Sequence, residues 1–157
     1  MQKEIVVTPK VSLVEANKKE DLATVLMLNS LLRSKTHVGF RDENDMHDVK
    51  NKGTIFLIKA GEETVGTVSL MSYGKEGTAL VRNLEVLQER QGRGIGTESV
   101  YLLLDVMRDR GFKKAMLRVR PGNKRARHVY KKVGFEEVGK DNSVGDGVER
   151  LVMEKRL

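Results

Sequence analysis

The order of hydrophobic and polar positions divides the first part of the chain into a strand and a helix. Residues 11–15 alternate weakly between apolar and polar side chains, which predicts a short strand. Apolar residues then recur at helical spacing over residues 22–32, with Asn29 as a polar exception. Asn17, followed three residues later by Glu20, predicts a capped start for this helix.

A polar and irregular stretch follows over residues 36–52, where we expect only a short helix at residues 42–48. Three β-rich runs then succeed one another, separated by short turns that contain glycine, at residues 54–60, 64–73 and 78–87. Runs so closely spaced predict an antiparallel meander.

The periodicity becomes helical after this meander. We expect, in order, a helix at residues 95–107 ended by Gly111, a strand at 115–120, a helix from Asn123 to Gly134, and strands at 135–139 and 148–154. This order predicts a mixed α/β (α+β) fold. Its mostly antiparallel sheet of about six to seven strands would be flanked by helices and contain one central β–α–β crossover.

Length and composition restrict the class of protein. The chain of 157 residues, of which 39% are hydrophobic and 32% charged, predicts a single globular domain over residues 1–157. No apolar run approaches the ~18 residues of a membrane span, and residues 1–4 do not resemble the start of a signal peptide. The absence of cysteine excludes disulfides, thiolate nucleophiles and Cys-based zinc sites from this chain. We therefore expect a cytoplasmic location without a membrane partner.

The net charge of +7 is concentrated in one segment. Residues 108–132 contain eleven Lys or Arg residues and a single acid, Asp109. Such a segment fits nucleic acid, an anionic surface or a phosphate-bearing cofactor, or it is a solvated helix face. We do not expect a nucleic-acid partner, because aromatic residues make up only 4% of the chain and form no base-stacking platform.

The clearest chemical signal lies where the third β-rich run meets the next helix. Glycines there allow the backbone to approach a phosphate, and the first N–H groups of a helix have no acceptor within it. The segment reads Gln91-Gly92-Arg93-Gly94-Ile95-Gly96, followed by the Thr97 hydroxyl. A Gly-rich turn without a ligand is the structural alternative. The spacing fits neither the P-loop nor the dinucleotide-binding fingerprint.

Two motifs in this order resemble the GNAT superfamily of N-acetyltransferases. The first is Gln-x-x-Gly-x-Gly after a strand that ends Leu84-Glu85-Val86. The second, over residues 123–135, resembles the family pattern N-x-x-A-x-x-x-Y-x-x-x-G-F. Residues 151–155 also resemble a typical last strand of the family.

The resemblance implies a site for acetyl-CoA, whose pyrophosphate would be held by backbone N–H groups of Gln91, Gly92, Arg93, Gly94, Ile95, Gly96 and Thr97. The strand residues Leu84, Glu85 and Val86 would pair with the pantetheine arm, and Asn123 would contact that arm beyond the neighbouring strand. Tyr130 would act as general acid toward the departing thiolate. Asn123 and Tyr130 are seven residues apart and share a helix face. Tyr130 also lies on the apolar stripe, so core packing is its structural alternative.

The expected reaction is transfer of an acetyl group from acetyl-CoA to a primary amine of a small molecule or peptide, by direct attack on the thioester. Arg118 stands where some peptide-modifying relatives have a glutamate, and Leu80 or Val81 stands where lysine-modifying relatives have one. Glu85 is the nearest remaining acid and would act as base or bind the substrate's charge. A solvent-facing strand carboxylate is the alternative.

Other candidates have structural alternatives. Some of Arg93, Lys124, Arg125 and Arg127 would face the phosphates of CoA, while Lys131, Lys132 and His128 would be solvated. The acids Asp42, Glu43, Asp45 and Asp48 would form a substrate wall or a solvated helix face. His37 and His47 have no metal-ligand spacing, so we expect no metal. A non-catalytic acyl-CoA-binding partner protein is the alternative function, and a homodimer is open because GNAT domains commonly dimerise.

Overall fold

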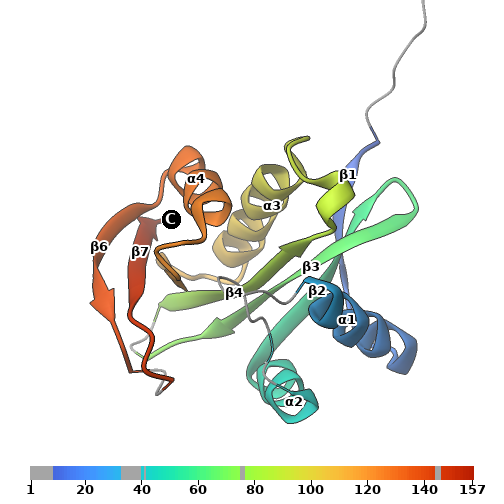
Figure 1. Ribbon diagram of the computed structural model, residues 1–157, viewed down its shortest axis with the longest axis horizontal. Coiled ribbons are helices and arrows are strands. Elements are labelled where there is room, and N and C mark those ends of the chain that lie inside the picture. Colours follow the sequence, from blue (N-terminus) through green and yellow to red (C-terminus); the bar gives the residue numbers. More distant parts are fainter. Residues whose placement is uncertain (1–8, 33–39, 41, 75–76, 144–145) are drawn as a thin grey trace, which may run out of the picture.

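Runs of alternating apolar residues build one twisted sheet (Figure 1). The computed structural model describes residues 9–32, 40, 42–74, 77–143 and 146–157. Within these residues the sheet has seven strands, in the spatial order β1 (Val11–Glu15), β2 (Gly53–Ala60), β3 (Glu63–Ser72), β4 (Thr78–Val86), β5 (Lys114–Val119), β7 (Arg150–Arg156) and β6 (Glu136–Asp141). The expectations for residues 1–4, for His37 and for the turn residues 75–76 and 144–145 lie outside the described residues.

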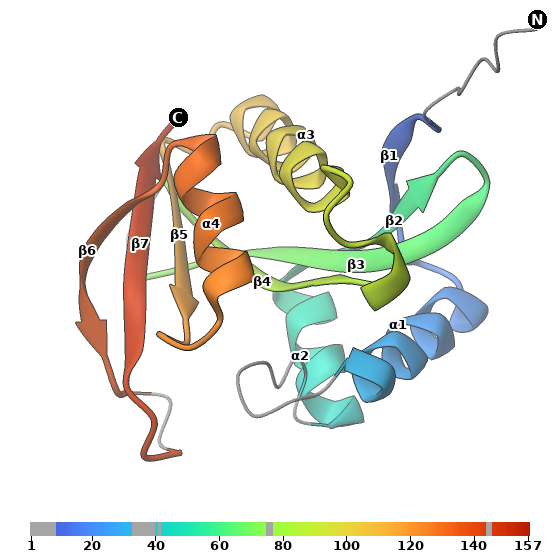
Figure 2. The same cartoon turned by 45° about the horizontal axis from the view of Figure 1, so that its top comes forward.

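The helices lie in two layers on opposite faces of the sheet (Figure 2). One layer consists of α1 (Lys19–Leu32) and α2 (Glu43–Lys52), and the other of α3 (Ile95–Asp109) and α4 (Lys124–Val133). Strand β2 serves both layers because successive side chains point to opposite faces. Phe56 and Ile58 belong to the larger core under α3 and α4, while Ile55 and Leu57 belong to the smaller core under α1 and α2.

All strand pairs are antiparallel except β4 with β5, which are parallel and connected by α3. This is the predicted crossover within a mostly antiparallel sheet, and the predicted fold class is confirmed. None of the helices in the described part of the chain is both long and apolar enough to cross a membrane.

The start of one helix and the end of another differ from the prediction. Helix α1 begins at Lys19. The Asn17 side-chain oxygen accepts a hydrogen bond from Lys50 Nζ (2.6 Å), and the Lys18 N–H donates to Asp21 instead of Glu20 (3.2 Å). The predicted Asn17–Glu20 cap is therefore wrong. Helix α2 starts where expected, with Asp42 as the N-cap that accepts the Asp45 N–H (2.8 Å). It is longer than expected, because it continues to Lys52.

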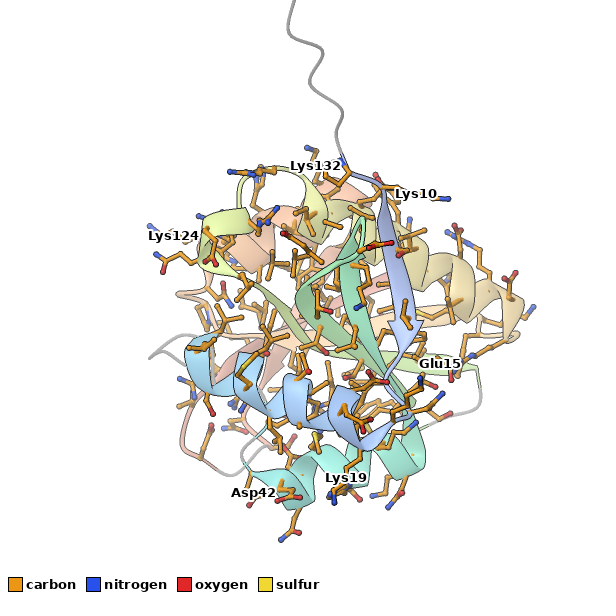
Figure 3. All side chains as sticks on the ribbon, turned by 90° about the vertical axis from the view of Figure 1, so that its right-hand side faces the viewer. Lys10, Glu15, Lys19, Asp42, Lys124 and Lys132 are labelled. Carbon is orange, nitrogen blue, oxygen red and sulfur yellow. The ribbon has the colours of Figure 1, made fainter. Side chains whose placement is uncertain are left out.

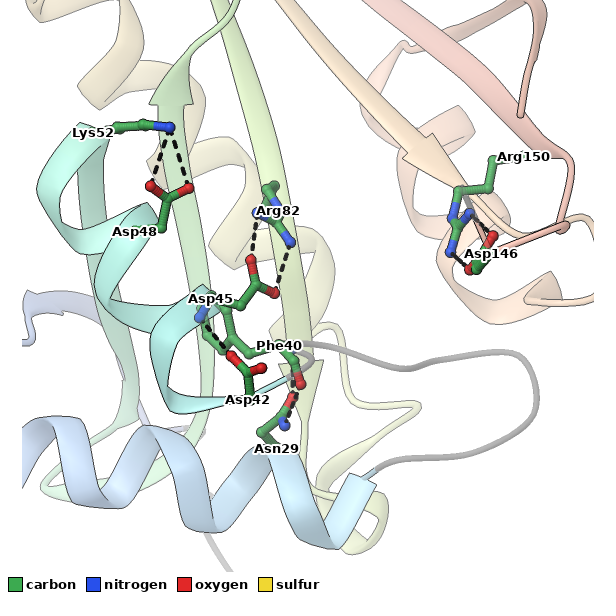
Figure 4. Close-up of polar contacts among 9 residues, drawn as sticks. All are labelled: Asn29, Phe40, Asp42, Asp45, Asp48, Lys52, Arg82, Asp146 and Arg150. Carbon is green, nitrogen blue, oxygen red and sulfur yellow. Dashed lines mark hydrogen bonds and ion pairs between the residues drawn. The ribbon is translucent and has the colours of Figure 1, made fainter. Parts of the chain in front are cut away.

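The polar exception on α1 has a structural role. Asn29 is buried, its amide nitrogen donates to the Phe40 carbonyl (2.9 Å), and its amide oxygen accepts the Phe40 N–H (2.7 Å) (Figure 4). Phe40 is itself fully buried in the smaller core. One side chain thus forms hydrogen bonds with both backbone groups of a buried residue.

We expect Asn29→Ala to reduce the free energy of unfolding by about 2 kcal/mol, because it removes two buried hydrogen bonds to the Phe40 backbone. Urea denaturation measures this loss. The matched control is Ser30→Ala, at an exposed neighbouring position on the same helix. Equal midpoints for the two variants would contradict the role assigned to Asn29.

Candidate active site

A bulge in β4 creates the space in which the predicted site residues meet. Thr67 of β3 pairs with Glu85, and Ser69 pairs with Arg82, so two residues of β4 oppose one residue of β3. Asn83 lies in this bulge with a φ of 55°, in the left-handed region. Such bulges bend the strand and increase its twist.

The bend separates β4 from its parallel neighbour. The pairing of β4 with β5 ends at Leu80 and Met116, before the bulge. Beyond the bulge, residues 84–86 continue to pair with β3 through Glu85 and Val86. Among the described strands, none pairs with their other edge. The sheet is therefore splayed next to Leu84, Glu85 and Val86, the strand residues predicted to pair with an extended ligand.

The Gly-rich segment forms the loop that leaves this strand. Gly92 and Gly94 have φ values of 77° and 82°, and a Cβ built on either one meets no atom within 4 Å. The loop is tied back to the strand by Gln91, whose side-chain nitrogen donates to the Val86 carbonyl (2.9 Å). The glycines thus allow a turn that a side chain would strain, and they leave its outer surface open.

This loop ends at an exposed helix N-terminus. Gly94 is the N-cap of α3 and offers no side-chain acceptor. The first helical hydrogen bond is the one that the Glu98 N–H donates to the Gly94 carbonyl (2.9 Å). The N–H groups of Ile95, Gly96 and Thr97 therefore precede the first helical hydrogen bond. Such groups, at the positive end of a helix dipole, favour an anion.

Helix α4 supplies the opposite wall. Asn123 caps it, since its side-chain oxygen accepts the Ala126 N–H (3.2 Å). The two helices approach closely, because a Cβ on Gly96 would lie 3.7 Å from the Val129 side chain. Asn123 therefore has a definite structural role beside the ligand contact predicted for it.

Between these walls lies a groove of about 580 Å³, a volume typical of cofactor sites. It brings together most of the predicted site residues, namely Leu84, Glu85, Val86, Gln91, Gly92, Gly94, Gly96, Thr97 and Asn123. Three predicted residues do not line it. Arg93 is exposed, whereas Ile95 and Tyr130 are buried in the larger core.

The charged lining of the groove is basic. Among the described residues that line it, the cations are Arg90, Lys124, Arg125 and Lys132, and the only acid is Glu85. Figure 3 shows Lys124 and Lys132 at the same end of the molecule, opposite Asp42 and Lys19. Lys132 and His128 are exposed, as expected, and both also line the groove. Both residues follow Lys124 at intervals of four positions, which places all three on one face of α4. This spacing could have predicted that they line the groove.

The prediction for Arg127 is not supported by its contacts. Its guanidinium binds the Glu137 carboxylate (2.9 Å) and lowers the pKa of that group. Lys131 binds the same carboxylate (3.3 Å). The side chain of Arg127 also donates to the Pro121 carbonyl (3.0 Å), and it does not line the groove.

Tyr130 packs in the core under α4. It is 6% exposed, and its ring meets Phe135 edge-on at 5.5 Å between centroids. Its hydroxyl makes no hydrogen bond to any described residue. Burial raises the pKa of Tyr130 above its ordinary value, so the phenol keeps its proton at neutral pH. The ring of Tyr130 therefore packs in the core, which was the alternative to a catalytic role. Its catalytic role stays a prediction.

Glu85 is buried at 3% exposure, so the alternative of a solvent-facing carboxylate is wrong. The acids of α2 divide into two kinds. Asp45 is buried and pairs with Arg82, whereas Asp48 forms an exposed pair with Lys52 (Figure 4). Glu43 and His47 form a second exposed pair. The prediction treated Asp45 like its exposed neighbours and missed Arg82, because their pairing spans 37 positions.

Arg118, at the position where some relatives have a glutamate, binds Asp141 (2.6 Å) and the Tyr73 hydroxyl (2.5 Å). These contacts link β5 to the end of β6 and to the end of β3. No group of three or more His, Cys, Asp or Glu side chains that could hold a metal occurs in the part of the chain that the structure describes.

The comparisons with known proteins agree with this geometry. The model of the acetyltransferase (GNAT) family matches residues 24–135, and the chain belongs to this family of acetyltransferases. No protein in the curated set matches the chain in sequence.

Three solved structures illustrate the shared fold. An IAA acetyltransferase from Bacillus cereus ATCC 14579 is 17% identical with a TM-score of 0.76, covering 94% of this chain and 100% of its own. The aminoglycoside acetyltransferase AAC(6')-Ib, in complex with coenzyme A, is 19% identical with a TM-score of 0.74, and the match covers 94% of this chain and 95% of its own. The ribosomal-protein-S18-alanine N-acetyltransferase from Escherichia coli is 18% identical with a TM-score of 0.75, covering 94% of both chains. At these identities the likeness concerns the fold alone.

We expect two glycine variants of the loop to change stability in opposite directions. Gly94→Ala should cost about 1–2 kcal/mol, because alanine is strained at positive φ. Gly96→Ala should be neutral or stabilising by up to about 1 kcal/mol, because alanine favours a helix and its Cβ has room beside Val129. Urea denaturation measures both. A loss of similar size in both variants would show that the strain does not lie at Gly94.

Proposed function

We propose that this protein transfers an acetyl group from acetyl-CoA to a primary amine of a small molecule or peptide. The observation that carries the proposal is the groove itself, in which the splayed edge of residues 84–86 meets the open N-terminus of α3. The complex of AAC(6')-Ib with coenzyme A supports this choice of donor, since that protein has the same fold.

The residues of the groove fit this donor. The N–H groups of residues 95–97 bind the pyrophosphate, and Lys124, Arg125 and Lys132 add positive charge around it. The edge of residues 84–86 binds the amide-containing arm as an additional strand would. Gly92 and Gly94 leave the loop surface open for close approach.

Bound acetyl-CoA supplies a thioester that an amine attacks directly, and this chain has no cysteine for a covalent relay. Glu85 binds the acceptor's ammonium group and accepts its proton. A lysine-like amine of pKa ~10.4 is about 3.4 units from neutrality at pH 7, which costs about 4.6 kcal/mol. An α-amine of pKa ~7.8 costs only about 1 kcal/mol on the same scale. The base therefore matters most for strongly basic acceptors.

Tyr130, held in its protonated form by burial, is the proton donor to the departing thiolate.

The names of the solved relatives define the range of acceptors to test. One is named for aminoglycosides and another for an alanine of ribosomal protein S18. A thiol-release assay across such small-molecule and peptide amines tests the proposal, together with the melting temperature in acetyl-CoA. We expect a higher melting temperature and thiol release with at least one amine. Neither effect with any amine would overturn the proposal, while stabilisation without release would favour a non-catalytic acyl-CoA-binding protein.

We expect Tyr130→Phe to lower kcat by about 100-fold or more, because it removes the proposed proton donor. Its affinity for acetyl-CoA should not change, as measured by calorimetry, because the substitution removes only the hydroxyl and keeps the ring packed against Phe135. The matched control is Tyr101→Phe, at an exposed position on α3. If Tyr130→Phe turned over as fast as this control, the hydroxyl would have no catalytic role.

A further inference from the structure

An ion pair connects the start of β3 to a residue that lines the groove. The Leu87 N–H donates to the Val65 carbonyl (2.9 Å), so the short 3₁₀ helix η1 (Gln88–Arg90) follows directly beside the first residues of β3. The guanidinium of Arg90 binds the carboxylate of Glu63, which is the first residue of β3. Arg90 immediately precedes the Gly-rich loop and lines the groove.

This contact distinguishes Arg90 from the other cations of the groove. Lys124, Arg125 and Lys132 line the same groove and form no ion pair with any described residue. Among these described cations, Arg90 alone has its charge offset by an acid. A guanidinium presents a planar fork of N–H groups that fits a phosphate as well as a carboxylate. Arg90 can therefore exchange one anion for the other.

The exposure of the two side chains favours such an exchange. The Glu63 side chain is 64% exposed and that of Arg90 is 28% exposed. Exposed ion pairs contribute little to stability, and water solvates the carboxylate readily once it is released. A phosphate in the groove would in addition have the open N-terminus of α3 and further cations around it. The phosphate is therefore the stronger partner for Arg90.

We propose that Arg90 binds the pyrophosphate of CoA and that Glu63 competes with this ligand for the guanidinium. Before CoA binds, the guanidinium contacts Glu63, and on binding it turns to the phosphate and leaves Glu63 to water. The inference rests on the proposed function, which places the pyrophosphate at residues 95–97. It gives a role to an acid that does not line the groove, since Glu63 lowers the affinity for CoA and thereby favours release of this product.

The opposite role of Glu63 would give a result of opposite sign. An acid that held Arg90 in position for the phosphate would be needed for tight binding, and removal of its charge would weaken the complex. An acid that competes with the phosphate does the reverse. The direction of the change in CoA affinity therefore decides between the two roles.

Calorimetric titration with CoA measures this direction without any need for turnover. In about 0.15 M salt the Debye length of about 8 Å limits the effect of exposed charges to their close neighbours. We expect Glu63→Gln to bind CoA about three- to fivefold more tightly, because the competing charge is removed. Arg90→Gln should bind CoA about tenfold more weakly, because a charge-assisted contact is lost. In the Arg90→Gln background, Glu63→Gln should have no further effect.

Two variants and a second ligand complete the experiment. Glu89→Gln is the matched control, because it removes the same charge at an exposed position next to Arg90 and breaks no ion pair with a described residue. It should leave the affinity unchanged. Arg90→Lys should recover part of the affinity lost in Arg90→Gln, since a lysine retains the charge. Dephospho-CoA keeps the pyrophosphate and lacks the 3′-phosphate, and it should show the same changes as CoA.

Unchanged or weaker CoA binding in Glu63→Gln overturns the inference, and so does an equal gain in the Arg90→Gln background. Effects that vanish with dephospho-CoA also overturn it, because they would place the contact at the 3′-phosphate. A wild-type protein that does not bind CoA overturns both this inference and the proposed function. CoA binding and thiol release that persist while Glu63→Gln changes nothing remove the inference alone, so the two failures are distinguishable.

Discussion

Strand β4 pairs with two neighbouring strands, antiparallel with β3 and parallel with β5, and the rest of the site depends on where the second pairing ends. Up to Leu80 it pairs in parallel with β5, and beyond the bulge at Asn83 it follows β3 alone. The resulting splay leaves a strand edge whose peptide groups face a groove in place of another strand. The same bend brings the Gly-rich loop and the start of α3 to the end of that edge. Acetyl-CoA has both a phosphate group and an amide-containing arm, so one backbone irregularity provides for both.

The two faces of the sheet contribute different chemistry to this opening. On the α3 and α4 face the groove is lined by backbone N–H groups and cations, and it is held by close helix packing at Gly96 and Val129. On the α1 and α2 face the buried polar contacts are specific pairs, Asn29 with Phe40 and Asp45 with Arg82. Glu85 is buried on that second face and still lines the groove. Under the proposed function, the anionic donor meets the cations of the first face, and the cationic acceptor meets Glu85 of the second.

Most of the fold could be predicted from local patterns, because the strands and helices of this chain follow their hydrophobic periodicity. The Gly-rich loop was predictable for the same reason, since glycine at positive φ is a local requirement. The bulge could not be predicted, because Asn tolerates a left-handed conformation and the surrounding sequence carries no pattern that indicates one. The partners of Asn29 and Asp45 lie 11 and 37 positions away and could be found only in three dimensions. That Arg127 binds Glu137 could not be predicted, because neighbouring positions on α4 face different surfaces.

The central claim is that the splayed edge of β4 and the N-terminus of α3 together form the binding site for CoA. Titration of the nitrogen-15-labelled protein with CoA, followed by amide chemical shifts, tests it most directly. The account predicts that the largest shift changes fall on residues 84–86 and 92–97, with smaller ones at the start of α4 and little change in β6. Saturable binding with changes confined to β6, β7 or α2, or no binding at millimolar CoA, would contradict it.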